Sequence, residues 1–258
     1  MLIAERQSLL QELIASRGVV DLETLASELR VSHSTVRRDV DQLVRQGIVT
    51  RTHGGVVWAG EKREEWTGSP DALDQRMGLQ VQAKLRIARA ARTLVHPGET
   101  VLLDGGSTTH YLARQLAGQA LQIVTNSLPI ANLFGYDEKA ELFVVGGLWN
   151  PRYGVFLGPT AEHALELIHA KTLFFSVAGI YDGSLYNQNV LLVQAERRMM
   201  QQAQRVVLLA DSTKFGQQAL SRLCDLEQID IVVTDCPLPE EFERSLHDAG
   251  CQIIVGED

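Results

Sequence analysis

Apolar residues recur at helical spacing in three short segments near the start of the chain. In the first two segments, the residues that share one helical face are Leu2, Leu9, Leu10, Leu13 and Ile14, and then Leu22, Leu25, Ala26 and Leu29. In the third segment they are Val36, Val40, Leu43 and Val44. Asp21 and Ser32 come just before the second and third segments, where short polar side chains cap helices. The pattern predicts three short helices joined by tight turns.

The third predicted helix has an arginine-rich polar side opposite its apolar stripe. That side carries Ser34, Arg38, Asp41 and Arg45, with Arg37 on its flank. Arg38 lies near the centre of the side, and its planar guanidinium can pair with guanine acceptors in a major groove. A flanking arginine more naturally meets phosphate. Asp39 lies nearer the core, where we expect it to orient an arginine.

Polar and apolar residues then alternate from Ile48 to Trp58 around Gly54 and Gly55, which favours a tight β-hairpin. Arg51 and His53 share one face of this hairpin, where they could touch backbone phosphate. Three helices followed by a hairpin predict a winged helix-turn-helix over residues 1–58. An isolated pair of arginines would also fit the solvated face of another small domain, but the caps, helices and hairpin together favour DNA binding.

Residues 59–71 are polar, contain Gly and Pro and lack periodicity, so we expect a linker before a second domain at 72–258. This second part alternates apolar runs with helical patterns, beginning with a helix at about 80–95. The predicted strands lie near 99–104, 121–125, 141–146, 171–178, 205–210, 229–234 and 251–255. Continuous apolar strands are typical of a mostly parallel sheet covered on both faces. The predicted fold class is therefore α/β with a small N-terminal domain.

Glycine, hydroxyl and amide residues follow four of these predicted strands. They are Asp104, Gly105, Gly106, Ser107, Thr108 and Thr109; Thr125, Asn126 and Ser127; Gly146 and Gly147; and Asp211, Ser212, Thr213 and Lys214. Backbone N–H groups and hydroxyls at strand–loop–helix junctions can hold phosphate, and Lys214 adds positive charge. Open α/β sheets bind ligands beyond the carboxyl ends of their strands. The same loops would also serve as ordinary turns and helix caps, and this alternative stays open.

Composition and charge are those of an ordinary globular protein, with 258 residues, 45% of them hydrophobic and 22% charged. The N-terminus has no long apolar run, so we expect neither a signal peptide nor a membrane span, and we expect a cytoplasmic location. The three cysteines form no CxxC motif and are expected to be reduced.

The net charge of −8 falls entirely outside the first 58 residues, which hold seven arginines and seven acidic residues. Within residues 30–53, however, five arginines outnumber two aspartates. Positive charge is thus concentrated where DNA would lie. A single domain of zero net charge would bind phosphates only modestly, so we expect a homo-oligomer, dimeric or tetrameric.

The alternative interpretation of the sequence is that the protein is an enzyme. Candidate acid–base groups for an aldose–ketose isomerisation are Asp104, Asp182, Glu196, Asp211 and Lys214. These residues belong to separate loops with no motif that pairs them, and the histidines show no zinc-ligand spacing. We therefore expect no catalytic residues, no metal and no cofactor. The alternative is a sugar-phosphate isomerase-like enzyme with an appended DNA-binding domain.

Several of these motifs together resemble the DeoR family of bacterial transcriptional regulators. They are Arg6, Leu10 and Ile14; Ser32-x-x-Thr35-Val36-Arg37-Arg38-Asp39-Val40; Arg51-x-His53-Gly54-Gly55; and, within residues 72–255, the DGGSTT, TNS, GG and DSTKFG segments. The resemblance implies a regulator, more often a repressor, of carbohydrate metabolism that responds to a phosphorylated sugar. It also implies an effector domain similar in fold to pentose-phosphate isomerases.

The resemblance and the patterns above together give the expected site residues. Those expected to bind operator DNA are Ser32, Ser34, Thr35, Arg37, Arg38, Arg45, Arg51 and His53. Those expected to bind the effector are Asp104, Gly105, Gly106, Ser107, Thr108, Thr109, Thr125, Asn126, Gly146, Gly147, Arg152, Glu196 and Lys214. The segment 179–196 is least similar to the family, so the identity of the effector is not predicted.

Overall fold

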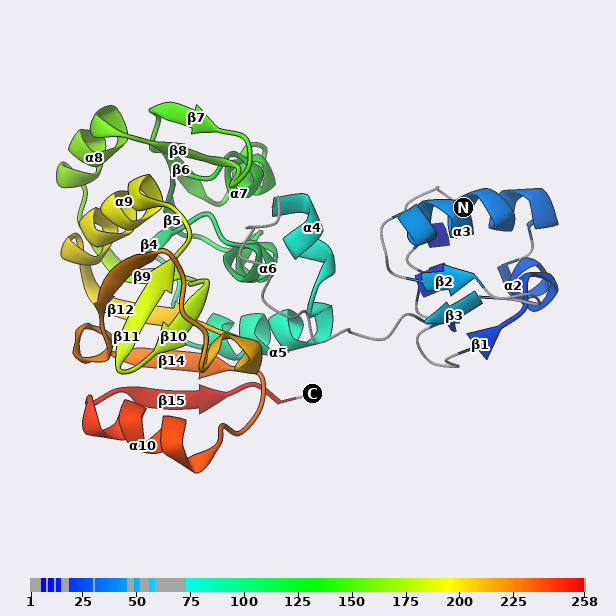
Figure 1. The fold of residues 1–258 in the computed structure, drawn as a ribbon. Helices are drawn as coiled ribbons and strands as arrows, with labels where there is room; N and C mark the ends of the chain where they lie inside the picture. The colour runs from blue at the N-terminus through cyan, green and yellow to red at the C-terminus, as the bar shows by residue number, and fades with distance from the viewer. Residues whose placement is uncertain are drawn as a thin grey trace. The chain divides into compact units, whose positions relative to one another are not determined.

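The computed structural model describes residues 6–7, 9–11, 13–14, 19–29, 31–45, 49–51, 56–58 and 73–257. The chain divides into two compact units, Met1–Thr67 and Gly68–Asp258 (Figure 1). This division falls inside the range 59–71 that the sequence predicts as a linker. That range lies outside the described residues, and the finer boundaries 1–58, 59–71 and 72–258 stay a prediction.

The smaller unit combines short helices with a small antiparallel sheet. The described residues between 6 and 14 are helical and are followed by α2 (Leu22–Leu29) and α3 (His33–Arg45). The sheet has the order β1 (Val19–Val20), β3 (Val56–Trp58) and β2 (Val49–Arg51), with Val49 opposite Trp58 and Arg51 opposite Val56. The predicted helices and hairpin are therefore present. Strand β1 was not predicted, because two valines form no detectable pattern.

The apolar stripes of the helices form the core of this unit. Its fully buried residues include Leu10, Ile14, Leu25, Val36 and Val40. Leu9 and Val44, which the stripes also include, are instead 44% and 36% exposed. The prediction that these two belong to the buried face was wrong. Both lie at the border of the apolar stripe of their helix, and the core of this small unit covers only the middle of the stripe.

Seven strands form the central sheet of the larger unit. Their order is β15 (Gln252–Val255), β14 (Ile231–Thr234), β12 (Ala203–Leu209), β9 (Ala170–Phe175), β4 (Thr100–Leu103), β5 (Gln122–Thr125) and β6 (Glu141–Val144). Every adjacent pair in this sheet is parallel. The α/β class, the parallel sheet and all seven predicted strands are confirmed.

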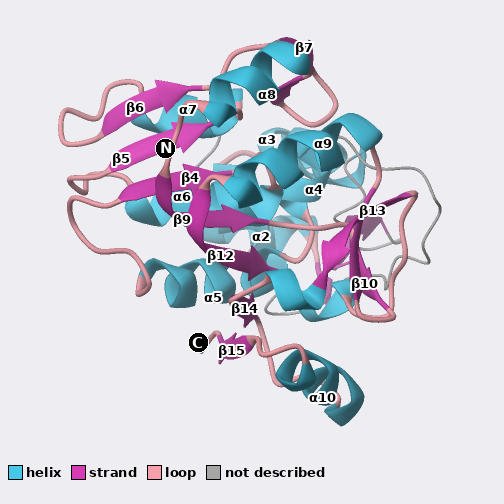
Figure 2. Ribbon diagram, turned by 90° about the vertical axis from the view of Figure 1, so that its left-hand side faces the viewer, coloured by secondary structure: helices cyan, strands magenta, loops and turns pink. Residues whose placement is uncertain are grey.

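Helices cover both faces of this sheet, which explains why its central strands are largely apolar (Figure 2). One face packs against α5 (Val81–Arg92), α6 (Ser107–Leu116) and α7 (Leu128–Phe134). The other face packs against α8 (Pro159–Glu166), α9 (Val190–Gln201) and α10 (Glu240–Asp248). Along β4, Val101 and Leu103 are buried in the first layer and Leu102 in the second.

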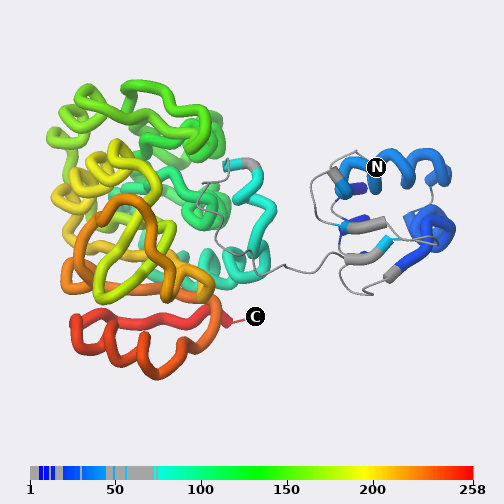
Figure 3. The backbone as a smooth tube through the Cα atoms, in the orientation of Figure 1, coloured from blue at the N-terminus to red at the C-terminus, as the bar shows by residue number. Residues whose placement is uncertain are grey.

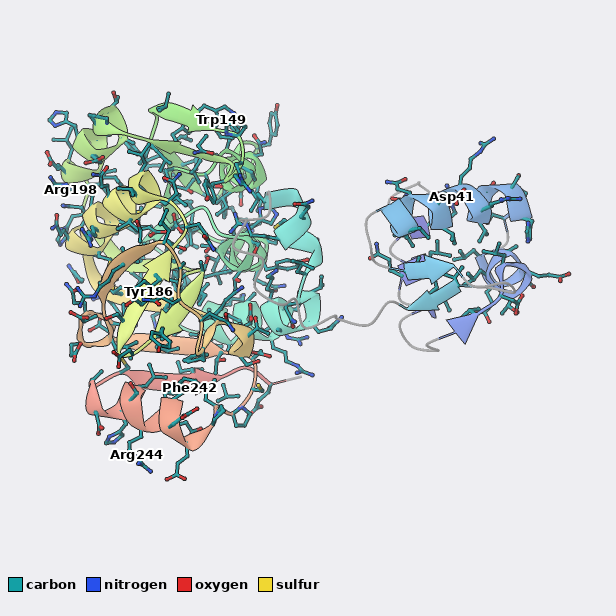
Figure 4. All side chains as sticks on the ribbon, in the orientation of Figure 1. Asp41, Trp149, Tyr186, Arg198, Phe242 and Arg244 are labelled. Atoms are coloured by element: carbon teal, nitrogen blue, oxygen red, sulfur yellow. The ribbon has the colours of Figure 1, made fainter. Side chains whose placement is uncertain are left out.

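Shorter elements at the ends of the main strands were not predicted. They are α4 (Leu73–Gly78), the hairpin of β7 (Leu148–Asn150) and β8 (Val155–Leu157), and the small sheet of β10 (Gly179–Tyr181), β11 (Ser184–Asn187) and β13 (Ser221–Asp225). On the β7–β8 hairpin, the ring centre of Trp149 lies 5.2 Å from the ring centre of Phe156 (Figure 4). Two 3-10 turns, η1 (Ser212–Lys214) and η2 (Leu226–Gln228), complete the unit. Within the described residues, every helix is too short or too polar to cross a membrane.

Candidate DNA-binding and effector sites

Helix α3 begins at a side-chain cap. The Ser32 hydroxyl accepts a hydrogen bond from the Thr35 backbone N–H at 3.3 Å and lies 2.8 Å from the Thr35 Oγ1. In the same way Asp21 caps α2, accepting from the Thr24 hydroxyl at 2.7 Å and from the Thr24 N–H at 2.8 Å. These two hydrogen bonds hold the pKa of Asp21 below its usual value. Both predicted caps are confirmed. They fix where α3 starts and therefore which of its residues face outward.

The outer side of α3 carries the residues predicted to meet DNA. Ser32, Ser34, Arg37 and Arg38 are exposed, and Thr35 is half-buried. Asp41 lies on the same helix (Figure 4). The side chains of Arg45 and Arg51, and the whole of His53, lie outside the described residues. The roles of all these residues in binding DNA stay predictions.

Asp39 orients an arginine, as predicted from its place near the core. The arginine is Arg6 of the N-terminal segment, whose Nε donates to Asp39 Oδ2 at 2.6 Å while its second guanidinium nitrogen lies 3.3 Å from Oδ1. The carboxylate is 5% exposed, and the pair raises the pKa of Arg6. The pair therefore ties the N-terminal segment to α3, while Arg37 and Arg38 of the same helix are exposed.

In the larger unit, the direction of strand addition reverses between β4 and β9. From β4 the chain proceeds to β5 and β6 on one side, and then returns to β9, β12, β14 and β15 on the other. In open α/β sheets, ligands bind at such a reversal, in the crevice at the carboxyl ends of the two central strands. Residues 104–109 lie at this edge, and α6 begins at Ser107 after its N-cap Gly106, with no side-chain cap hydrogen bond. Free backbone N–H groups at this helix end suit an anion.

The glycines in this loop are required by close packing. A Cβ on Gly105 would lie 2.0 Å from Val155 Cγ1, and one on Gly106 would lie 1.9 Å from Ser176 Oγ. The loop after β4 is thereby pressed between β8 and the end of β9. Ser107, Thr108 and Thr109 follow it, all buried.

The loop after β5 joins the same crevice. Thr125 Oγ1 donates to the Leu103 carbonyl at 2.7 Å and accepts from the Ser127 N–H at 3.0 Å, so this hydroxyl holds the two loops together. The Asn126 amide donates to the Phe156 carbonyl at 3.2 Å, while its Oδ1 is buried without a hydrogen-bond partner. Asn126 can therefore accept a hydrogen bond from a ligand.

Asp104 and Glu196, which the sequence gives no reason to pair, influence each other in the structure. Both are at most 3% exposed, and each has one carboxyl oxygen without a hydrogen-bond partner. Burial raises the pKa of Asp104 to about 6, opposed by the Gly105 N–H and the charge of Arg76. Burial and then the negative charge of Asp104 raise the pKa of Glu196, although Asn187 donates to its Oε1 at 2.6 Å.

Arg76 of α4 is a residue that the sequence analysis missed. Its guanidinium carbon lies 5.6 Å from the ring centre of Tyr153, and its charge lowers the pKa of both Asp104 and Glu196. No motif surrounds it, because α4 is short and lies just after a segment without periodicity. It supplies a positive charge beside the two buried carboxyls.

The other predicted effector residues lie apart from this cluster or have roles of their own. Arg152 is exposed, and its carbonyl accepts from the Leu73 N–H at 2.9 Å. Gly147 follows edge strand β6, where a Cβ would lie 2.7 Å from the Leu157 carbonyl, and Gly146 beside it is exposed. Lys214 follows β12, two strands from β4, and is half-buried. Their part in binding an effector stays a prediction.

Two acids considered for the enzyme alternative also lie outside the cluster. Asp182 is exposed in the turn between β10 and β11. Asp211 caps η1 by accepting from the Thr213 N–H at 3.1 Å. Within the described residues, no group of three His, Cys, Asp or Glu side chains is placed to hold a metal ion.

The crevice therefore combines an uncapped helix end with buried oxygens that have no partner in the protein. These oxygens are Asp104 Oδ1, Asn126 Oδ1, Glu196 Oε2 and Thr109 Oγ1. A buried polar atom without a partner is costly, and clusters of such atoms occur where a ligand or ordered water completes the hydrogen bonds. An arginine-bearing helix in one unit and this crevice in the other define a DNA-binding regulator with a sensor domain.

Comparison with known proteins identifies the family. The model of the DeoR-like helix-turn-helix domain matches residues 6–62, and that of the DeoR C-terminal sensor domain matches residues 79–236. The chain is 32% identical over 252 residues to the HTH-type transcriptional regulator UlaR of Shigella sonnei, covering 97% of this chain and 98% of the relative. The same values hold for UlaR of Escherichia coli K12. The chain belongs to the DeoR family of transcriptional regulators.

Solved structures are similar over larger or smaller parts of the fold. Ribose 5-phosphate isomerase A of Methanocaldococcus jannaschii is 19% identical, with 51% of this chain and 53% of that chain covered and a TM-score of 0.38. The translation initiation factor eIF-2B of Pyrococcus horikoshii is 12% identical, with 88% and 81% covered and a TM-score of 0.40. Similarity at this level supports no conclusion about activity.

The buried carboxyls predict an unusual dependence of stability on pH. Because the folded-state pKa of Asp104 is raised to about 6, its protonated form stabilises the fold at low pH, and this contribution is lost as the pH rises toward 6. Asp104→Asn should therefore be more stable than the wild type by about 1–3 kcal/mol at pH 7.5 and gain little near pH 4. Urea unfolding at both pH values measures the difference.

Asp182→Asn is the matched control for this prediction, since it removes an exposed carboxylate from the same unit. Its effect should be the same at both pH values. A gain for Asp104→Asn that does not change with pH would contradict a raised pKa at this position.

Proposed function

We propose that this DeoR-family regulator is a repressor of a carbohydrate-metabolism operon that responds to a phosphorylated sugar. Residues of α3 and the β2–β3 hairpin bind double-stranded operator DNA, and the crevice between β4 and β9 binds the effector. The protein acts as a regulator rather than an isomerase, in keeping with the family to which both of its domains belong.

The observation that carries the effector assignment is the set of buried oxygens beside the uncapped α6 terminus. The free N–H groups of α6 are suited to a phosphate. The unpartnered oxygens of Asp104, Asn126 and Glu196 are acceptors and are suited to a ligand with several hydroxyl donors. A phosphorylated sugar carries both kinds of group, whereas a bare phosphate would leave the acceptors unsatisfied.

The effector is tested first by thermal-shift screening of sugar phosphates, because a ligand that binds only the folded state raises apparent stability. The hit is then titrated calorimetrically into the wild type and Lys214→Ala. Lys214→Ala should weaken binding by about 1.5–3 kcal/mol through loss of a charged hydrogen bond to phosphate, and leave DNA binding without ligand intact. The unphosphorylated sugar should bind far more weakly.

Lys139→Ala removes an exposed lysine from the loop before β6 and serves as the control. Equal affinity of wild type and Lys214→Ala would remove Lys214 from the site. A sugar phosphate that binds without changing operator affinity would remove the effector role of the crevice, because response requires different affinities for the two states.

Arg38 is the residue that we expect to read a base. Arg38→Ala should lower affinity for the operator and relax its sequence preference by about 1–3 kcal/mol, since a bidentate contact to guanine is lost. Arg51→Ala should weaken binding to every DNA sequence to a similar extent, as expected for a phosphate contact. Fluorescence anisotropy on operator and random duplexes separates the two, and equal losses on both duplexes for Arg38→Ala would exclude base reading.

The regulator should act as an assembly of at least two copies, joined through the sensor domain. A DNA-binding domain without net charge gains affinity when two copies read repeated half-sites. Light scattering should therefore give at least a dimeric mass for the full chain. A monomer that holds a single half-site tightly would be the contrary result.

A further inference from the structure

Helix α4 is the first described element of the sensor unit, and the chain leads from it through residues 59–72 to strand β3 of the DNA-binding unit. Three parts of the sensor unit hold this helix. The Leu73 N–H donates to the Arg152 carbonyl at 2.9 Å, and Tyr111 of α6 donates its hydroxyl to the Met77 carbonyl at 3.1 Å. Buried Lys84 of α5 donates to the carbonyls of Arg76 and Leu79.

Each of these attachments belongs to an element that frames the crevice. Tyr111 lies on α6, whose first turn is the proposed phosphate site, and α4 runs beside that helix (Figure 3). Arg152 precedes β8, and Val155 of that strand contacts the loop of Gly105. A change in the crevice therefore reaches α4 through elements that touch both.

The side chain of Arg76 makes the most direct of these connections. Its guanidinium lies over Tyr153, which is 5% exposed and packs in a cluster with Leu192 and Ala195 of α9. The next residue of α9 is Glu196. Arg76 is thus joined by packing to the helix that carries one of the two crevice carboxyls, and its charge acts on both.

We propose that Arg76 is part of the effector site and that α4 transmits occupancy of this site to the DNA-binding unit. The proposal rests on the proposed function, because it takes the crevice as the effector site. A ligand that donates hydrogen bonds to Asp104 and Glu196 changes the charge that Arg76 faces. Because Arg76 belongs to α4, the helix is held differently with and without the ligand, which gives the two states that a response requires.

The experiment uses the full chain without any sugar phosphate, so that it does not depend on the identity of the effector. Glu196→Gln, Arg76→Ala and the double variant are compared by hydrogen exchange of the amides of α4. Their binding to a duplex selected by the wild type from a random-sequence pool is measured in parallel. Tyr111→Phe removes the tether to Met77 but no crevice group. Arg244→Ala is the control, since Arg244 is an exposed arginine of α10, a helix on the opposite face of the sheet from α6.

Glu196→Gln and Arg76→Ala should each speed exchange in α4 and shift duplex affinity in the same direction by about fivefold or more, the lower end of measured allosteric couplings. The double variant should change affinity no more than either single variant, because both remove one interaction. Tyr111→Phe should alter exchange and duplex affinity likewise, and Arg244→Ala should alter neither. Arg76→Lys, which keeps the charge, should lie closer to the wild type.

Unchanged α4 exchange in Glu196→Gln, or additive effects in the double variant, would overturn the proposal. Thermal unfolding of each variant shows whether it is folded, and if Arg76→Ala is not, Arg76→Lys and Tyr111→Phe decide the outcome. If the variants couple as expected but no sugar phosphate binds, the proposed effector is wrong and the role of α4 stands. If a sugar phosphate binds and changes DNA affinity while the variants do not couple, the proposed effector stands and the proposed role of α4 is wrong.

Discussion

The sensor unit depends on one constraint, the reversal of strand addition between β4 and β9. Helices cover both faces of the parallel sheet, so its central strands are largely apolar and most of the buried polar groups lie at strand ends. At most strand ends, the connection to the next helix covers the edge. Between β4 and β9 the two connections leave in opposite directions, which is where open α/β sheets have their ligand-binding crevice. Among the described residues, the buried oxygens without a hydrogen-bond partner on Asp104, Thr109, Asn126 and Glu196 gather at this point.

Burying two carboxyls in such a crevice costs stability, which a protein selected for stability alone would avoid. Asp104 and Glu196 repel each other and are deprived of water, and the charge of Arg76 offsets this only in part, since both pKa values stay raised. Replacement of such groups by apolar residues is often neutral or stabilising. Their presence beside an uncapped helix end is therefore better explained by binding than by folding.

The sequence was informative where one local pattern decides the structure. The buried parts of β4, β5 and β12 are runs of apolar residues, such as residues 101–103 and 206–209, because both of their faces are covered. Ser32 and Asp21 cap helices through contacts within three residues. Elements of two to five residues, such as β1 and the β7–β8 hairpin, leave too few positions for a pattern. They form because β3 or the β4 and β5 loops supply a partner from elsewhere in the chain.

The same distinction applies to the effector site. The strand-end loops at 104–109 and 125–127 were predicted together, because the carboxyl ends of parallel strands share an edge. The association of Asp104 with Glu196 and Arg76 was not, since it joins a loop to two helices that are distant in sequence. Packing of α4 against α6 and of α9 against β9 and β12 brings these charges near each other, and no spacing rule describes it.

In the DNA-binding unit, an ion pair inside the fold changes how the net charge is distributed over the surface. Residues 1–58 have no net charge, which by itself argues against strong attraction to phosphate. However, Asp39 is turned inward and bound by Arg6 from another segment, whereas Arg37 and Arg38 of the same helix are exposed. An internal pair of this kind removes one negative charge from the outer side of α3 without using its arginines. The pair is neutral as a whole, so it leaves the net charge of residues 1–58 unchanged and shifts the local balance on the outer side of α3 toward positive charge.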